Sequence, residues 1–253
     1  MESSSRLARE QVIDTVYLSV PLTTRSPEQF AELRDLAPEY PEVREVGIDD
    51  FVAAYDRLGR DMSDHSEVLE RAIGQLKADA SKLQFGITVY EHELDQGRLD
   101  DDEISPRVRA MVDNVHLYLL YRRAASRFGK YVKDVKRLFP NARVIAGSYA
   151  YDRIDYLPCK SSSTKPCSTR EEVELFSKVL DEQIALLKNG DVYAIEFYPA
   201  NFGKETEWHG WQRERICRPG SRERCIDTTL QMRRVVQQEI AELRGGEGTQ
   251  QNR

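Results

Sequence analysis

The sequence predicts an α/β fold, a (β/α) barrel of the TIM type that shows six recognisable strand-helix units. Short runs of β-branched and aromatic residues alternate with helical stretches, as in a parallel sheet with crossover helices. The 253 residues are close to the usual length of an eight-unit barrel. Six units are two fewer than the eight of a closed barrel. Three explanations stay open: two N-terminal units lie upstream of this sequence, two units are present but unrecognised, or the sheet is open. We favour a barrel-like arrangement that is incomplete at its N-terminal side.

Each expected strand is a short apolar run, and each expected helix has apolar residues at three- and four-residue steps. The strands are expected at residues 15–22, 43–49, 84–90, 114–120, 143–149 and 192–198. The helices are expected at residues 27–36, 51–83 with a break around 61–66, 105–112, 128–138, 170–189 and 226–243. We expect residues 1–244 to form a single domain, and the polar, glycine-rich residues 245–253 to form a disordered tail.

Helix boundaries carry their own signals. Ser26 and Ser105 each precede a proline, which suits an N-cap followed by the first helical residue. Ser168 with Glu171 resembles a capping box, and Asn189 with Gly190 resembles a C-cap before the last strand. The strand-helix units are therefore expected to begin and end sharply.

Composition excludes several classes of partner. The net charge of −6 and the absence of an 18-residue apolar run give no reason to expect nucleic acid or a membrane as partner. The basic stretch 213–224 is interrupted by Glu214 and Glu223. No P-loop, G-x-G-x-x-G, G-x-S-x-G or C-x-x-C motif is present, which argues against nucleotide-binding, serine-hydrolase and thioredoxin-like functions. The oligomeric state stays open.

Four cysteines form two pairs with equal spacing, Cys159 with Cys167 and Cys217 with Cys225. Eight-residue spacing is wider than in zinc ribbons and favours disulfide bonds, although free thiols and a metal site stay open. The first residues lack a signal-peptide pattern. Localisation is therefore unknown: secreted or periplasmic if the cysteines are paired, and cytoplasmic otherwise.

Polar side chains follow the predicted strands, at the end of the sheet where βα folds place their active sites. The expected catalytic carboxylates are Asp49, Asp50, Glu91 and Glu196. The expected substrate-binding residues are Tyr90, His116, Tyr118, Tyr149, Tyr151, Asp152, Tyr198, Asn201 and Trp208. No metal and no cofactor are expected. Paired carboxylates with surrounding tyrosines are what cleavage of a glycosidic bond requires, so an oligosaccharide or glycoconjugate is the expected substrate.

Structural roles compete with these assignments. Asp49 and Asp50 could cap the following helix, although two adjacent acids exceed what a cap requires. Glu91 and Glu93 are expected to share a strand face while His92 points the other way, so at most part of this triplet can point to one site. His116 is more often a hydrogen-bonded core histidine. Glu196 lies in an apolar strand and needs a partner, for which Arg122 and Arg153 are candidates.

The strand end Val46-Gly47-Ile48-Asp49-Asp50-Phe51 resembles the Asp-Asp signature of TIM-barrel glycoside hydrolases of family 84, which act on N-acetylhexosamines. This resemblance implies a substrate-assisted mechanism in which Asp49 polarises the acetamido group of the substrate and Asp50 is the general acid. Tyr90, Tyr149, Asn201 or Trp208 would contact the sugar. Two other functions stay open: a divalent-metal-dependent barrel enzyme (isomerase, lyase or hydrolase), with ligands such as Asp50, Glu91, His92 and His116, and a non-catalytic carbohydrate-binding barrel.

Overall fold

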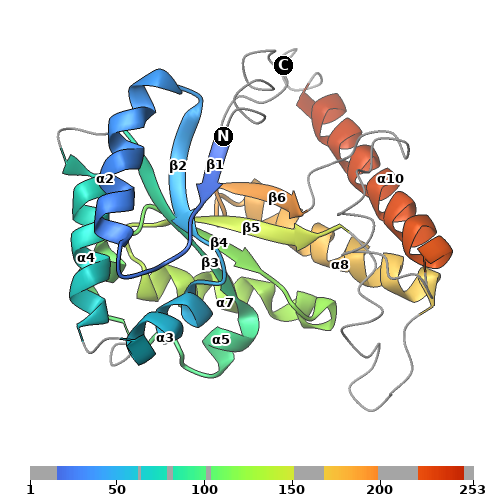
Figure 1. Ribbon diagram of the computed structural model, residues 1–253. Coiled ribbons are helices and arrows are strands. Elements are labelled where there is room, and N and C mark those ends of the chain that lie inside the picture. The colour runs from blue at the N-terminus through green and yellow to red at the C-terminus, as the bar shows by residue number, and fades with distance from the viewer. Residues whose placement is uncertain are drawn as a thin grey trace. The chain divides into compact units, whose positions relative to one another are not determined.

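A computed structural model describes residues 16–61, 64–78, 82–100, 104–150, 168–198 and 222–247 (Figure 1). The chain divides into two compact units. Unit 1 comprises the residues up to Tyr118 together with Lys130–Ile145, and unit 2 comprises Leu119–Gly129 and the residues from Ala146 onward.

The described residues contain the six predicted strands, joined in one sheet in the sequential order β1-β2-β3-β4-β5-β6. The strands are β1 (Val16–Ser19), β2 (Val43–Ile48), β3 (Gln84–Tyr90), β4 (Asn114–Tyr118), β5 (Arg143–Tyr149) and β6 (Ala194–Tyr198). Strands β1 to β4 pair in parallel. Consecutive strands are neighbours throughout, as in a barrel wall, whereas a doubly wound sheet reverses its strand order. The predicted α/β class is confirmed.

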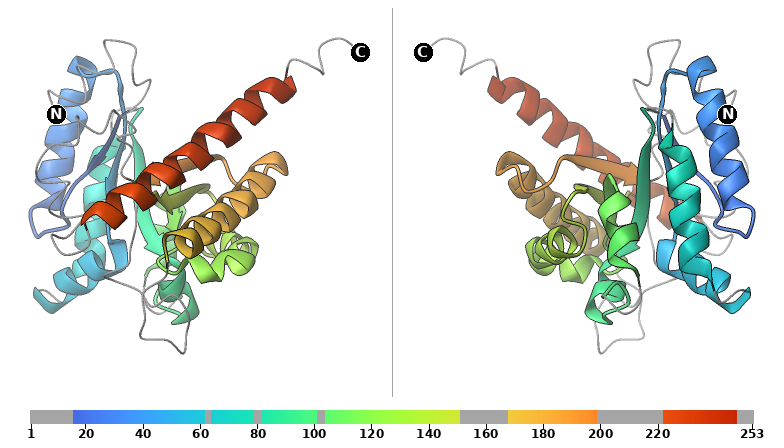
Figure 2. Two further views of the ribbon diagram at one scale, coloured as in Figure 1. Left: turned by 90° about the vertical axis from the view of Figure 1, so that its right-hand side faces the viewer. Right: turned by 90° about the vertical axis from the view of Figure 1, so that its left-hand side faces the viewer.

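Helices follow the strands of unit 1 as predicted. They are α2 (Ser26–Leu36), the 3₁₀ turn η1 (Ala37–Glu39), α3 (Phe51–Asp61), α4 (His65–Leu76), α5 (Glu91–Asp95), α6 (Pro106–Met111) and, after the 3₁₀ turn η3 (Arg122–Arg127), α7 (Phe128–Leu138). The predicted break between α3 and α4 is confirmed. Ser105 caps α6, because its hydroxyl accepts from the Val108 amide at 3.2 Å. Helices α2 and α4 lie side by side (Figure 2).

The two faces of the unit 1 sheet differ in polarity. On one face the side chains are apolar and buried, from Val46, Ile48, Phe85, Ile87, Val89, Val115 and Leu117. The alternate positions of the same strands carry Glu45, Gln84, Thr88, Asn114 and His116, most of them also buried. Successive strand residues point to opposite faces, so the sheet has one apolar face and one polar face.

Unit 2 contains α8 (Thr169–Lys188), β6 and α10 (Arg222–Glu247), and α8 packs against α10 (Figure 1). Ser168 caps α8 in the predicted capping box with Glu171. The apolar stripe of α8 supplies Phe176, Leu180 and Ile184 to the core of this unit, where Met232 and Val236 of α10 join it. That stripe was expected to pack against the sheet, and in unit 2 it also packs against a helix.

Helix α10 runs to Glu247, three residues into the predicted tail, and the rest of that tail lies outside the described residues. Cys225 is buried in α10 and is not a free thiol, but the other three cysteines lie outside the described residues, so their pairing stays a prediction. Within the described ranges, no helix has the length and apolar character needed to cross a bilayer.

Candidate functional site

The candidate site lies in unit 1, where β2 and β3 end. Asp49 and Asp50 follow β2, Tyr90 is the last residue of β3, and α5 begins at Glu91. The two strands are parallel neighbours, with Ile48 opposite Ile87, so their carboxyl ends lie on the same edge of the sheet. The sequence places acids after both strands, and the fold brings them to one edge.

Tyr90 forms hydrogen bonds with an acid that follows β2 and with an acid of α5. Its hydroxyl donates to Oδ1 of Asp50 at 2.7 Å, and its backbone amide donates to Oε2 of Glu93 at 2.8 Å. The Asp50 side chain is exposed, whereas Glu93 is buried. One tyrosine therefore holds an exposed carboxylate and a buried carboxyl group on the same strand end.

Asp50 has an unusual backbone. Its φ of 48° lies in the left-handed region, which a non-glycine residue adopts at some cost in energy. Its amide donates to Oδ1 of Asp49 at 3.0 Å, and its carbonyl accepts from Ala54 at the start of α3. Asp49 thus stabilises the turn before α3, while Asp50 bonds across to the next strand.

The pKa of Glu93 is raised to about 7. Burial of the carboxyl group is the main cause, and the negative charges of Asp50 and Glu91 act in the same direction. The hydrogen bond from the Tyr90 amide and the positive charge of Arg98 lower the pKa and offset part of the shift. A carboxyl group that keeps its proton near neutral pH can donate that proton to a substrate.

Aromatic rings surround the acids. The His92 ring stacks on Tyr90 with 5.7 Å between centroids, and the Tyr118 ring lies 6.5 Å from Tyr90. Burial lowers the pKa of His92, which favours its neutral form. Tyr90 and His92 are partly exposed, and Tyr90 bonds Asp50.

The expectation that residues 91–93 continue the strand is wrong. They form the first turn of α5, and both Glu91 and Glu93 are buried there. Acids are favoured at a helix N-terminus, and an acid three residues into a helix can bond the N-cap amide, as Glu93 does with Tyr90. The three-residue spacing of Tyr90 and Glu93 is visible in the sequence. The burial that raises the pKa of Glu93 is not. The predicted catalytic set omits Glu93.

His116 lies below this edge, on the polar face of the sheet, and is 4% exposed. Its Nε2 is 2.7 Å from Oε1 of Glu45. Oε2 of Glu45 accepts from Asn114 at 2.8 Å, and Asn114 in turn bonds Gln84 and Arg143. His116 is therefore a buried, hydrogen-bonded histidine, as the structural alternative for this residue predicted. The sequence did not indicate that its partner would be the ionisable Glu45.

Other predicted site residues lie in unit 2. The rings of Tyr149 and Tyr198 meet edge to face with 6.0 Å between centroids, and Glu196 is partly exposed in β6. Arg122, a suggested partner of Glu196, forms a buried ion pair with Glu172 and donates to the Tyr149 carbonyl at 2.7 Å. Four predicted site residues and Arg153 lie outside the described residues: Tyr151, Asp152, Asn201 and Trp208.

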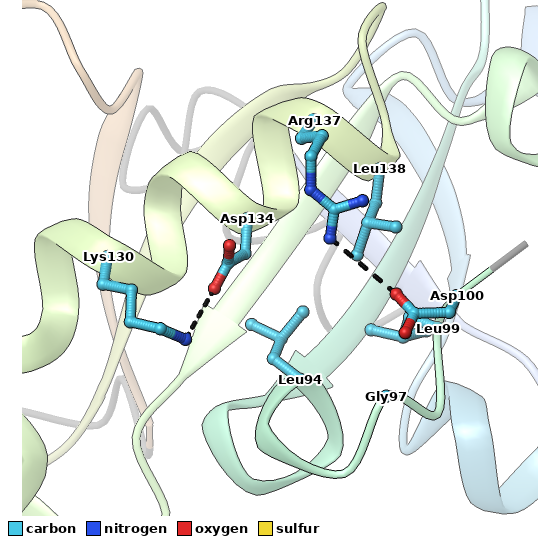
Figure 3. Close-up of a pocket in the computed structure, with 8 residues that line it drawn as sticks. All are labelled: Leu94, Gly97, Leu99, Asp100, Lys130, Asp134, Arg137 and Leu138. Atoms are coloured by element: carbon cyan, nitrogen blue, oxygen red, sulfur yellow. Dashed lines mark hydrogen bonds and ion pairs between the residues drawn. The ribbon is translucent and has the colours of Figure 1, made fainter.

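A separate hollow of about 200 Å³ opens between α7 and the turn after α5 (Figure 3). Its charged side chains pair with one another: Lys130 with Asp134 at 2.8 Å and Arg137 with Asp100 at 3.8 Å. Asp50, Tyr90 and Glu93 do not line it. Across the described part of the chain, no group of three or more His, Cys, Asp or Glu side chains is arranged to hold a metal ion.

Glu93 is expected to make the stability of the fold depend on pH. Its pKa rises from 4.5 to about 7 on folding, so the folded state holds an extra proton between these pH values. The resulting stabilisation is complete below pH 4.5, falls as the pH rises through about 7, and amounts to at most about 3 kcal/mol. Glu93→Gln should remove this dependence. Urea unfolding at pH 5 and pH 8 measures it, and an equal loss of stability in both proteins would contradict the assignment.

No protein-family model matches the chain, and no curated protein is similar to it. The chemistry of the strand-end acids therefore rests on their geometry.

Proposed function

We propose that the protein is a carbohydrate-active hydrolase that cleaves a glycosidic bond at the Asp50-Tyr90-Glu93 site. The proposal rests on two different carboxyl groups that both accept hydrogen bonds from Tyr90. Asp50 is exposed, whereas Glu93 is buried and has a pKa of about 7. Glycosidic cleavage needs one acid that is protonated near neutral pH and one that is ionised.

Each group has a defined role in the proposed reaction. Glu93 donates its proton to the glycosidic oxygen as the bond between that oxygen and the anomeric carbon breaks. The Asp50 carboxylate stabilises the positive charge that develops at the anomeric carbon, and a water molecule then supplies the hydroxyl group of the free sugar and a proton that restores Glu93. Tyr90 fixes Asp50 through its hydroxyl, which limits the reorganisation needed during the reaction.

The proposed site changes the roles that the family 84 resemblance implies. Asp50 accepts a hydrogen bond from Tyr90, which suits charge stabilisation, and Glu93 takes the place of the general acid. Asp49, which bonds the Asp50 amide, remains the proposed contact for an acetamido group. Tyr90, His92 and Tyr118 supply rings on which a sugar can stack. The TIM type of the barrel belongs to the same proposal, supported by the sequential strand order.

Asp50→Asn is the first test. The change keeps the shape and the hydrogen bond from Tyr90 but removes the charge, so we expect kcat for an aryl N-acetylglucosaminide to fall by about 10²-fold or more. Asp35→Asn, which changes an exposed carboxylate of α2, is the matched control and should leave kcat unchanged. Equal activity of wild type and Asp50→Asn would refute the role of Asp50. Tight binding of the sugar without any turnover by the wild type would instead identify a non-catalytic carbohydrate-binding protein.

A further inference from the structure

The hollow between α7 and the turn after α5 takes no part in the proposed reaction, since Asp50, Tyr90 and Glu93 do not line it. All of its lining residues belong to unit 1, so the fold of that unit alone forms it. Its volume of about 200 Å³ is below the roughly 300 to 1,000 Å³ of pockets that hold drug-sized molecules. A ligand of this hollow must therefore be small.

The charged side chains of the hollow form two unlike pairs. The Lys130 ammonium is 2.8 Å from Asp134 and 3.7 Å from Asp95, so two carboxylates already neutralise it. Arg137 and Asp100 point toward each other (Figure 3), but their closest nitrogen and oxygen are 3.8 Å apart. This distance exceeds the limit of about 3.2 Å for a normal N–H···O hydrogen bond. The Arg137-Asp100 pair is therefore open.

Both members of the open pair can be reached by a ligand. Within the described part of the chain, neither the Arg137 guanidinium nor the Asp100 carboxylate forms a hydrogen bond. Their side chains are 64% and 58% exposed. A guanidinium group can donate two parallel hydrogen bonds to a carboxylate, and a carboxylate accepts readily from an ammonium group. The open pair thus offers one site for each charge of a zwitterion.

Gly97 shapes the turn that carries Asp100. Its φ of 67° lies in the left-handed region, which glycine adopts without strain. The Asp100 amide donates to the Gly97 carbonyl at 3.1 Å, and a Cβ atom at Gly97 would lie 2.9 Å from Oδ2 of Asp100. The glycine therefore leaves room for the Asp100 carboxylate beside the hollow.

The remaining lining is apolar and comes from three leucines, Leu94, Leu99 and Leu138. Leu99 and Leu138 are buried, and Leu94 is partly exposed. An apolar group that enters the hollow would lose contact with water against these side chains, which is favourable by about 0.8 kcal/mol for each buried methylene group. The hollow thus combines a short apolar surface with one open pair of opposite charges.

We propose that this hollow binds a free α-amino acid with an apolar side chain. The carboxylate of the ligand accepts hydrogen bonds from Arg137, its ammonium group donates to Asp100, and its side chain lies against the leucines. Such a zwitterion replaces one contact of 3.8 Å by two charge-assisted contacts, which a ligand with a single charge cannot do. The proposal does not depend on the proposed function.

Calorimetric titration of the full chain with L-leucine tests the proposal. Three further probes each lack one feature of leucine: 4-methylpentanoate lacks the ammonium group, 3-methylbutylamine lacks the carboxylate, and glycine lacks the apolar side chain. We expect each to bind at least about tenfold more weakly than leucine. Arg137→Gln and Asp100→Asn should each weaken leucine binding about tenfold. Lys133→Gln, which changes an exposed charge of α7 outside the hollow, is the matched control.

Three results would overturn the inference. A Kd of leucine above about 1 mM would show that the hollow is not a site for it. Equal affinity for leucine and 4-methylpentanoate would identify a site for simple carboxylates instead. Leucine binding that is unchanged in both Arg137→Gln and Asp100→Asn would place the ligand elsewhere. None of these results bears on the hydrolase, which the kcat of Asp50→Asn tests.

Discussion

Replacing Glu93 by Gln is expected to lower the turnover of an aryl N-acetylglucosaminide by about 10²- to 10⁴-fold, the usual contribution of a general acid. The amide has the shape of the carboxyl group and can still accept the hydrogen bond from the Tyr90 amide, so the turn into α5 should persist. Steady-state kinetics with an unchanged circular dichroism spectrum would show that chemistry, and not folding, has been lost. A variant with at least half of the wild-type kcat would refute the assignment of Glu93.

The pH profile gives a second, independent measurement of the same group. Because the pKa of Glu93 is about 7, kcat/KM of the wild type should fall as the pH rises through this value and the acid loses its proton. The residual activity of Glu93→Gln should lack this limb. Arg98→Met, which removes the charge that lowers the pKa of Glu93, should move the limb to higher pH. A limb that stays in place in both variants would belong to another group.

The elements of this fold could be predicted because their signals are local. Strands β3 and β5 and helix α7 have the bounds that the sequence predicts, since apolar runs and periodic stripes lie within each segment. The capping box at Ser168 was also correct. Helix α5 was misassigned, because five residues are too few to show a helical period and the preceding strand has no glycine or proline to mark its end.

The site was predicted in part. Asp50 and Tyr90 were expected at neighbouring strand ends, and the structure joins them by a hydrogen bond, although they are 40 positions apart in the chain. Glu93 was not in the catalytic set because its pKa depends on burial, which only the packed structure reveals. Glu45 gave no signal either: in the run Val-Arg-Glu-Val-Gly-Ile it follows an exposed arginine, and its partner His116 is 71 positions away.

Glu45→Ala is expected to lower the free energy of unfolding by about 3 to 5 kcal/mol, because it leaves His116 and Asn114 buried without their carboxylate partner. That loss is a large share of the roughly 5 to 15 kcal/mol that stabilises a typical domain. Urea unfolding at pH 7 measures it. Arg143→Gln, which alters the same network but leaves the Glu45-His116 contact in place, should cost much less. Equal losses in the two variants would contradict a special role for the Glu45-His116 contact.

The double variant Glu45→Met with His116→Leu tests whether the Glu45-His116 pair contributes to the stability of the sheet. Replacing a buried pair of ionisable groups by apolar side chains of similar volume is often neutral or stabilising by about 1 to 4 kcal/mol, and the Asn114 amide keeps its bond to Gln84 at 3.0 Å. We therefore expect the double variant to be at least as stable as the wild type. A double variant that is as unstable as Glu45→Ala would mean that the pair stabilises the sheet itself. A double variant that is as stable as the wild type would mean that the fold does not need the pair.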